Sequence, residues 1–102
     1  MKTFEQICRQ LSGGEFEFSR HAFKRAVERN ISDGEIAQVS KNAEIIEDYP
    51  DDKYSPSCLI LGFTNERRPL HIQASFADTS MVRIITLYEP DVEEWIEFRK
   101  RR

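Results

Sequence analysis

The sequence predicts an α+β fold in which N-terminal helices pack on one face of a four-stranded antiparallel sheet, followed by a short C-terminal helix. Two features lead to this prediction. Apolar side chains recur at helical spacing in residues 1–41, whereas they alternate with polar ones from residue 43 onward. Helices that precede a run of strands with hairpin-length connections are typical of an antiparallel sheet covered on one side. The 102 residues are enough for a single domain with one core, which we place at residues 1–102.

The first part of the chain is expected to be mainly helical. Helices are predicted at residues 3–11, 18–31 and 32–41, with a short strand at residues 15–18. Helix starts are marked by capping patterns at Thr3 with Gln6, Ser32 with Glu35, and Asp91 with Glu94. The last of these patterns predicts the short C-terminal helix.

The second part is expected to form strands at residues 43–49, 57–64, 69–76 and 81–88. In the third strand Leu70 and Ile72 alternate with His71 and Gln73, so the two pairs point to opposite faces. The helices should cover the face that carries Leu59, Leu61, Phe63, Leu70, Ile72, Ala74 and Phe76. By the same alternation the opposite face should present His71, Gln73, Thr86 and Tyr88.

The second helix concentrates positive charge. His21, Arg25 and Arg29 follow at intervals of four residues, so they stack on one side of the helix, with Lys24 beside them. Its apolar stripe, expected to face the core, is Ala22, Phe23, Ala26 and Val27. Two interpretations of the stacked cations remain open. A bound anion such as a phosphate relieves their repulsion, or the arginines pair with carboxylates elsewhere in the fold.

The formal net charge of -3 hides an uneven distribution of charge. Residues 44–52 contain carboxylates and no cation, whereas Arg67, Arg68 and residues 99–102 form basic clusters. A chain that is acidic overall can therefore still bind a polyanion locally, because the field depends on the patch and not on the sum.

The sequence offers little for a metal or a cofactor, and we expect neither. Cys8 and Cys58 lack the spacing of a metal-binding pair, and the chain has only two histidines. The N-terminal residues lack the apolar stretch of a signal peptide, and no segment has the apolar length of a membrane span. We therefore expect a cytoplasmic protein that does not enter a membrane.

Five motifs occur in an order that resembles a known family. They are H-A-x-x-R-x-x-x-R-x-I at residues 21–31, E-I-I-E-D-Y-P at 44–50, L-I-L-G at 59–62, P-L-H-I at 69–72 and I-I-T-L-Y-E-P-D at 84–91. From about Phe18 to Trp95 the chain resembles the domain of unknown function 4258 family. That family is similar to the RelE/barnase-like (BECR) ribonuclease toxin superfamily, whose toxin members cleave RNA and are often encoded beside an antitoxin. The resemblance implies two N-terminal helices on a four-stranded antiparallel sheet, with the site on the open sheet face.

The resemblance implies a ribonuclease site, and because the chain pairs two histidines with stacked arginines and lacks a metal-ligand cluster, we expect that site to work without a metal. Such cleavage needs a base for the 2′-hydroxyl, an acid for the leaving 5′-oxygen, and cations for the charge on the phosphoryl group. Histidine is the residue type best suited to both proton transfers near neutral pH. We expect His21, His71, Tyr88 and Arg25 to be catalytic, and Arg29, Lys24, Arg67 and Arg68 to bind RNA or phosphate.

We interpret the chain as a metal-independent endoribonuclease of the toxin–antitoxin type, which cleaves RNA by attack of the 2′-hydroxyl. Its expected partners are RNA and an antitoxin protein. The alternative is a non-catalytic RNA- or protein-binding module. A third interpretation, a structural domain whose arginines pair with the acidic residues 44–52, also remains open.

Overall fold

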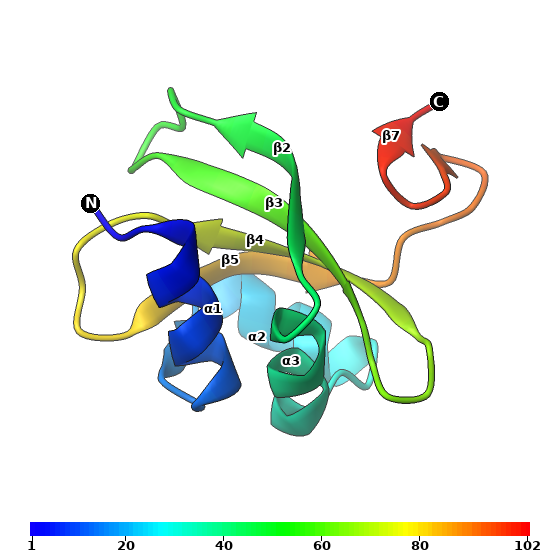
Figure 1. Cartoon of the computed structure of the whole chain (residues 1–102), viewed down its shortest axis with the longest axis horizontal. Helices are drawn as coiled ribbons and strands as arrows, with labels where there is room; N and C mark the ends of the chain where they lie inside the picture. The colour runs from blue at the N-terminus through cyan, green and yellow to red at the C-terminus, as the bar shows by residue number, and fades with distance from the viewer.

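A computed structural model describes all residues, 1–102, as three helices beside a curved sheet, with a small hairpin at the C-terminus (Figure 1). The helices are α1 (Phe4–Ser12), α2 (Arg20–Glu28) and α3 (Asp33–Ser40). The strands are β1 (Phe16–Phe18), β2 (Glu44–Tyr49), β3 (Ser57–Phe63), β4 (Pro69–Ser75), β5 (Val82–Tyr88), β6 (Trp95–Ile96) and β7 (Lys100–Arg101). None of the helices has the length and apolar character that a membrane span requires.

The main sheet has five strands in the order β1-β5-β4-β3-β2. Strands β2 to β5 pair as antiparallel neighbours, whereas β1 pairs with β5 in parallel. The predicted four-stranded antiparallel sheet of the RelE/barnase-like type is therefore wrong. The edge strand β1 is joined to β5 by backbone hydrogen bonds at both of its ends. They run from Val82 N–H to Glu15 O and from Ser19 N–H to Ile84 O, each 3.0 Å. A segment this short contains no signal for its partner strand, so its parallel pairing could not be predicted.

The capping patterns of the first and third helices are confirmed. The Thr3 hydroxyl accepts the backbone N–H of Gln6, and the Gln6 side chain accepts the backbone N–H of Thr3. Ser32 and Glu35 form the same reciprocal pair at the start of α3. Between the helices, Asn30 has a φ of 54°, a left-handed conformation that asparagine tolerates. These local signals place the helices where the sequence predicts them.

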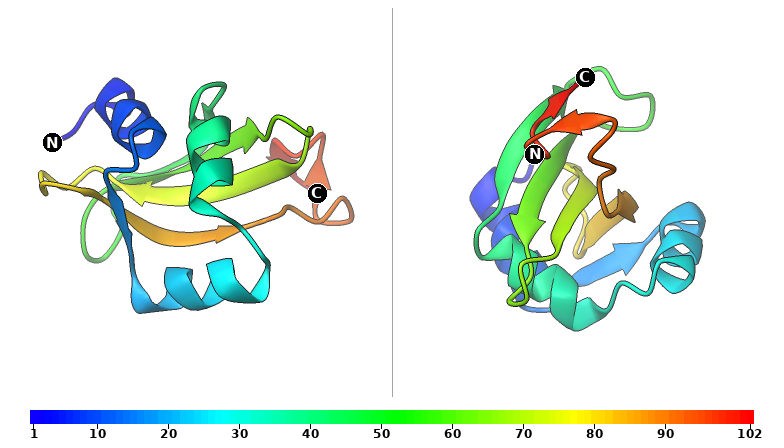
Figure 2. Two further views of the ribbon diagram at one scale, coloured as in Figure 1. Left: turned by 90° about the horizontal axis from the view of Figure 1, so that it is seen from below. Right: turned by 90° about the vertical axis from the view of Figure 1, so that its right-hand side faces the viewer.

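Helices α1 and α3 cover one face of the sheet, where most of the core lies, and α2 flanks the sheet on its β5 side (Figure 2). Its members include Ile7, Leu11, Ile36, Val39, Cys58, Ile60, Leu70, Ile72, Ala74, Val82, Ile84 and Leu87. Helix α3 approaches β3 so closely that a Cβ atom on Gly62 would lie 2.2 Å from the carbonyl oxygen of Val39. Glycine at this position therefore allows direct contact between helix and sheet.

The prediction that Leu59, Leu61 and Phe63 lie under the helices is wrong. Leu59 pairs with Gln73 and Leu61 pairs with His71, on the opposite face of the sheet. Leu59 and Leu61 are nevertheless only 2% and 0% exposed, because this face is covered as well. A strand that is buried on both faces has continuous apolar residues, so alternation does not reveal which face is which. The predicted placement of His71 and Gln73 away from the helices is confirmed.

Helix α2 lies along the β5 side of the sheet, next to the edge strand β1 (Figure 2). Ala22 and Ala26 are buried there, as predicted, but Phe23 and Val27 are 59% and 66% exposed. The prediction that the whole apolar stripe faces the core is therefore wrong. At the end of the sheet only a narrow face of the helix meets other elements, and the small alanine side chains occupy it.

The predicted C-terminal helix is also wrong. The carbonyl oxygen of Asp91 accepts the N–H groups of Glu94 and Trp95, which makes a single turn. The chain then reverses at Glu97 and Phe98, whose φ angles are 51° and 63°, and forms the β6–β7 hairpin. Figure 2 shows the hairpin over the sheet face that the helices leave open. Burial of Trp95, which is 3% exposed, favours this path over a longer helix.

Candidate functional site

The sheet face opposite α1 and α3 has an open part and a part covered by the β6–β7 hairpin (Figure 2). The open part contains a cleft of about 640 Å³, bordered by α2, the β2–β3 loop and strands β4 and β5. The lining residues are Ser19, His21, Asp52, Tyr54, Ser55, Gln73, Ser75, Arg83 and Ile85. The volume lies within the range of small-ligand sites, about 300–1,000 Å³.

One wall of the cleft is formed by α2 and β5 and carries the imidazole of His21 and the guanidinium of Arg83. His21 stands in the first turn of α2, two residues after the helix cap Ser19. The Ser19 hydroxyl donates to the carbonyl oxygen of Ile85 at 2.9 Å, which fixes the start of α2 to β5. Arg83 comes from β5, is half exposed, and has only a loose ion pair of 3.6 Å with Glu17. An exposed imidazole and an available guanidinium therefore share one wall.

The other side of the cleft is a polar network. The Ser57 hydroxyl donates to Asp52 Oδ2 at 2.7 Å, and Gln73 Nε2 donates to the same oxygen at 3.2 Å and to Ser57 Oγ at 3.0 Å. Beside it, the hydroxyls of Ser55 and Ser75 lie 2.7 Å apart. Each of these side chains is held by a neighbour, so the wall is rigid before any ligand binds.

Tyr54 stands at the mouth of the cleft on the β2–β3 loop and is 89% exposed. Its only aromatic or cationic neighbour is Lys53, whose Nζ lies 5.5 Å from the ring centre. An aromatic ring exposed to this extent has both faces available for stacking.

His71 lies in the covered part of the same face and is fully buried. Its Nε2 lies 2.6 Å from the Phe98 carbonyl oxygen and its Nδ1 lies 3.3 Å from the Tyr88 hydroxyl. The carbonyl can only accept, so Nε2 carries the proton and Nδ1 accepts from Tyr88. Trp95 packs edge-on against the imidazole at 4.5 Å between ring centres. Burial lowers the pKa of His71, and the same cause raises the pKa of Tyr88.

An ion pair between Arg101 of the hairpin and Glu47 of β2 holds the hairpin over His71. Arg101 donates two hydrogen bonds to Glu47, of 2.8 and 3.1 Å, and its guanidinium lies 4.6 Å from the centre of the Trp95 ring. The hydrogen bonds from Arg101 lower the pKa of Glu47. Burial, together with the adjacent carboxylate of Glu47, raises the pKa of Tyr49 to about 12. Arg99 adds a second bond from the hairpin, 2.6 Å long, to Glu44.

The cation row of α2 is only partly engaged by other residues. Arg25 pairs with Glu28 at 3.3 Å, and Lys24 lies 4.0 Å from the same carboxylate. Arg29 is exposed, and its charge is close enough to lower the pKa of Tyr88 slightly, against the larger effect of burial. The row therefore runs beside β5, from His21 at the cleft toward Tyr88 at the covered part.

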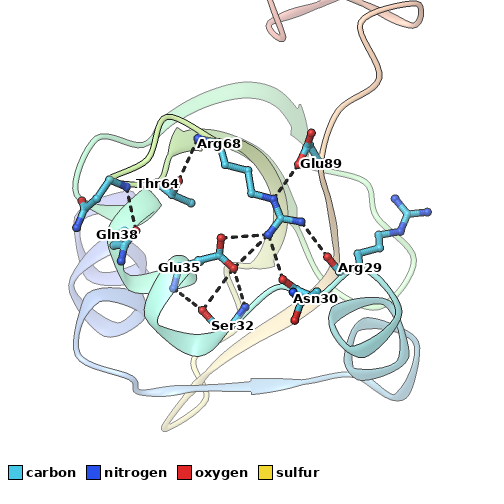
Figure 3. Close-up of polar contacts among 9 residues, drawn as sticks. Arg29, Asn30, Ser32, Glu35, Gln38, Thr64, Arg68 and Glu89 are labelled. Carbon is cyan, nitrogen blue, oxygen red and sulfur yellow. Dashed lines mark hydrogen bonds and ion pairs between the residues drawn. The ribbon is translucent and has the colours of Figure 1, made fainter.

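Arg68, expected to bind RNA, is the centre of an internal network (Figure 3). Its guanidinium donates to both Glu35 oxygens at 3.0 and 3.1 Å, to Glu89 at 2.8 Å, and to the carbonyl oxygens of Arg29 and Asn30. This one side chain thus joins the end of α2, the start of α3 and the end of β5. Burial opposes ionisation of Glu35, but the Ser32 N–H and Arg68 outweigh it and lower the pKa of Glu35. Each of the three Arg68 guanidinium nitrogens already donates to a protein oxygen, so this side chain serves the fold and not a phosphate.

Arg67, the neighbouring residue, points the other way. It is exposed at the tip of the β3–β4 hairpin and its guanidinium lies 5.4 Å from the ring centre of Phe63. The structure thus separates the predicted residues into three places. His21 lies in the cleft with the α2 cations beside it, His71 and Tyr88 lie under the hairpin, and Arg67 and Arg68 lie at the β3–β4 turn.

Four residues that line the cleft were not predicted from the sequence as site residues. They are Asp52, Tyr54, Gln73 and Arg83. Three of them carried a signal: Gln73 alternates with the apolar positions of β4, Arg83 does so in β5, and Tyr54 is an aromatic residue in a polar loop. No group of three or more His, Cys, Asp or Glu side chains is arranged to hold a metal ion.

The comparisons with known proteins agree with the motifs. No curated protein and no solved structure matches the chain. The sequence pattern of the domain of unknown function DUF4258 matches residues 18–89, which include α2, the cleft, His71 and Tyr88 but not the β6–β7 hairpin. Because the match covers most of the chain, the protein belongs to the DUF4258 family.

Proposed function

We propose that the chain binds RNA in the cleft and cleaves it without a metal, with His21 as the residue that transfers the proton. The observation that supports this proposal is that His21, Arg83 and the exposed ring of Tyr54 line one cleft. A guanidinium suits a phosphate, and an aromatic ring suits a nucleobase. The cleft thus has one feature for each part of a nucleotide, with an acid–base group beside the phosphate position.

In the proposed reaction His21 takes the proton of the 2′-hydroxyl while the 2′-oxygen attacks the adjacent phosphorus. The bond from phosphorus to the 5′-oxygen breaks, and that oxygen receives a proton from water. The products are a 2′,3′-cyclic phosphate and a free 5′-hydroxyl. Arg83, with Arg25 and Arg29 further along α2, offsets the negative charge that builds on the phosphoryl oxygens.

The second candidate is a non-catalytic RNA-binding module with the same cleft. It is favoured by the position of His71, the second histidine expected to transfer a proton. Both of its ring nitrogens are occupied, by Phe98 and Tyr88, and the hairpin covers it. Cleavage with a separate base and acid needs two proton-transfer groups, whereas the cleft has only one accessible histidine. The cleft therefore suits RNA binding at least as well as such catalysis.

The wider setting that we propose follows from the resemblance to ribonuclease toxins: a cytoplasmic chain restrained by an antitoxin protein. A protein partner is supported by the exposed apolar residues Phe23 and Val27 on α2. Expression of the chain alone should slow cell growth, and His21→Ala should relieve the effect.

The test is to incubate purified protein with single-stranded and duplex RNA in the presence of EDTA, and to identify the product ends. We expect 2′,3′-cyclic phosphate ends, a loss of turnover of about 10²-fold or more for His21→Ala, and a comparable loss for Arg83→Ala. RNA affinity of His21→Ala should remain close to that of the wild type.

Lys41→Ala is the control, because it removes an exposed cation that lies outside the cleft and outside the cation row of α2. Equal cleavage by wild type, His21→Ala and Arg83→Ala would point to a contaminating nuclease and reject the enzyme. RNA binding without any cleavage would support the binding module instead. Absence of both would reject the cleft as an RNA site.

A further inference from the structure

On the polar wall of the cleft, Asp52, Ser57 and Gln73 form a group that presents two hydrogen-bond acceptors and no free donor. Asp52 is a carboxylate and can only accept, so the Gln73 amide must turn its NH2 group toward Oδ2. The Ser57 hydroxyl gives its proton to the same oxygen and accepts the second N–H of Gln73. This arrangement fixes the orientation of the Gln73 amide and leaves Gln73 Oε1 and Asp52 Oδ1 without protein partners.

These two oxygens are accessible to a ligand. Every buried side-chain nitrogen and oxygen in the structure has a hydrogen-bond partner. Because Gln73 Oε1 and Asp52 Oδ1 have none, both must be in contact with solvent. The two groups are adjacent, since Gln73 Nε2 lies 3.2 Å from Asp52 Oδ2. The wall therefore offers one acceptor oxygen from each of two hydrogen-bonded side chains, one of them charged.

We infer that this wall recognises guanine, with the base stacked on Tyr54 and its Watson–Crick edge on Asp52 and Gln73. The inference rests on the proposed RNA binding and specifies its substrate as single-stranded RNA that contains guanine. Guanine alone among the four bases places two donors side by side, N1–H and the N2 amino group. Adenine and cytosine present a single amino group beside a ring acceptor, and uracil presents one N–H between two carbonyls. Each of these three bases places an acceptor against one of the two wall oxygens, which is unfavourable.

The stacking position explains the requirement for a single strand. Tyr54 is 89% exposed at the mouth of the cleft, and a base reaches its ring only when it is unpaired and unstacked. Arg83 and His21 on the opposite wall then meet the phosphate of the same nucleotide. The base and phosphate sites lie on different elements, the β2–β3 loop with β4 on one side and α2 with β5 on the other.

Asp52 and Gln73 also border a second, shallower hollow with Tyr49, Pro50 and Asp51. That hollow lacks a cation and a fully exposed aromatic ring among its lining residues, so it suits a nucleotide less well. The carboxylate of Asp51 distinguishes the two hollows, because it lines only the second.

The experiment measures binding of the intact wild-type chain to short uridine-rich RNAs that differ in one central base: guanine, inosine, adenine or uracil. Inosine is guanine without the N2 amino group. We expect the guanine RNA to bind about tenfold or more tightly than each of the others, in line with a lost contact to a charged acceptor. Asp52→Asn should abolish the preference, because an amide replaces one acceptor by a donor. Asp51→Asn should keep it.

Tyr54→Ala provides a variant whose folding is not at risk, because the ring is almost fully exposed. It should weaken binding of all four RNAs by about 5- to 100-fold and keep the order of the bases. Equal affinity of the wild type for all four RNAs would overturn the inference and leave RNA binding intact. A preference lost in Asp51→Asn instead of Asp52→Asn would place the base in the other hollow and also overturn it. Absence of binding to every RNA would reject the proposed function itself.

Discussion

His71 and Phe98 are joined by a hydrogen bond of 2.6 Å between the Nε2 atom of the imidazole and the carbonyl oxygen. Phe98 belongs to the turn of the β6–β7 hairpin, so this bond connects the hairpin directly to the centre of the sheet. Burial favours the neutral imidazole, whose other nitrogen accepts from Tyr88, and outweighs the bond to Phe98, which by itself favours the protonated form. The hairpin is therefore most stable while His71 carries no charge.

The first prediction concerns pH. Burial lowers the pKa of His71, so the folded chain binds this proton less readily than the unfolded chain. As the pH falls below about 6.5, the unfolded chain takes up the proton first, and stability falls until the folded pKa is reached. Thermal unfolding between about pH 6.5 and 5 should therefore show a declining Tm in the wild type. His71→Gln should flatten the decline, since the glutamine amide can still donate toward Phe98.

Thr86→Val serves as the control, because it changes the same sheet face without removing a titratable group. It should keep the slope of the wild type. A histidine NMR titration that assigned His71 a pKa at or above the ordinary value would contradict the prediction.

A second prediction compares adjacent arginines, both expected from the sequence to bind RNA. Arg68→Ala removes bonds to Glu35, Glu89 and two backbone carbonyls and should destabilise the chain by about 1–3 kcal/mol. Arg68→Lys should not restore stability, because an ammonium group cannot reproduce the planar fork. Arg67→Ala, on the exposed hairpin tip, should change stability by less than about 0.5 kcal/mol. Urea denaturation measures all three, and equal stability of the two alanine variants would be the contrary result.

A third prediction concerns the contact between α3 and β3. Gly62→Ala should cost about 1–3 kcal/mol, because the new methyl group meets the backbone carbonyl of Val39, which cannot rotate away. Gly34→Ala is the matched control: its Cβ would come no closer than 3.8 Å to Ser32 Oγ, within a helix that favours alanine. That variant should gain up to about 1 kcal/mol. Chemical denaturation decides between them, and a Gly62→Ala variant as stable as the wild type would show that α3 packs differently.

A fourth prediction addresses the orientation of α2. Val27→Lys should change stability by less than about 0.5 kcal/mol, because Val27 is 66% exposed. Ala26→Lys should cost more than about 2 kcal/mol, because Ala26 is 6% exposed and its neighbours leave no room for a charged chain. If thermal denaturation showed Val27→Lys to be less stable than Ala26→Lys, α2 would have the orientation that its apolar stripe predicts.

The sequence predicts most of the helices and strands because their signals are local. The capping boxes at Thr3 and Ser32 form as expected, and the alternation in β4 places His71 and Gln73 on the correct face. Local signals do not show that the β6–β7 hairpin covers part of the sheet face opposite α1 and α3. The capping pattern at Asp91 does produce one turn, but burial of Trp95 against the sheet then prevails over further helix.

The candidate site is predicted only in part for the same reason. His21 could be identified because the cation row of α2 is periodic. The cleft itself depends on the β2–β3 loop, whose Asp52 and Tyr54 meet Gln73 and Arg83 only through strand order. Arg68 shows the converse: a basic residue in a turn suggests a surface ligand, but its partners Glu35 and Glu89 are distant in the sequence and become neighbours only in the fold.

Trp95 is the only tryptophan of the chain, and it lies on the hairpin between His71 and Arg101. Tryptophan fluorescence, excited at a wavelength that the three tyrosines do not absorb, therefore reports from a single position, at the contact between the hairpin and the sheet. A partner that lifts the hairpin would shift the emission to longer wavelength and open it to a soluble quencher. A ligand that enters only the cleft would leave the emission unchanged. The chain thus contains its own optical reporter, which separates events at the two parts of the sheet face without any label.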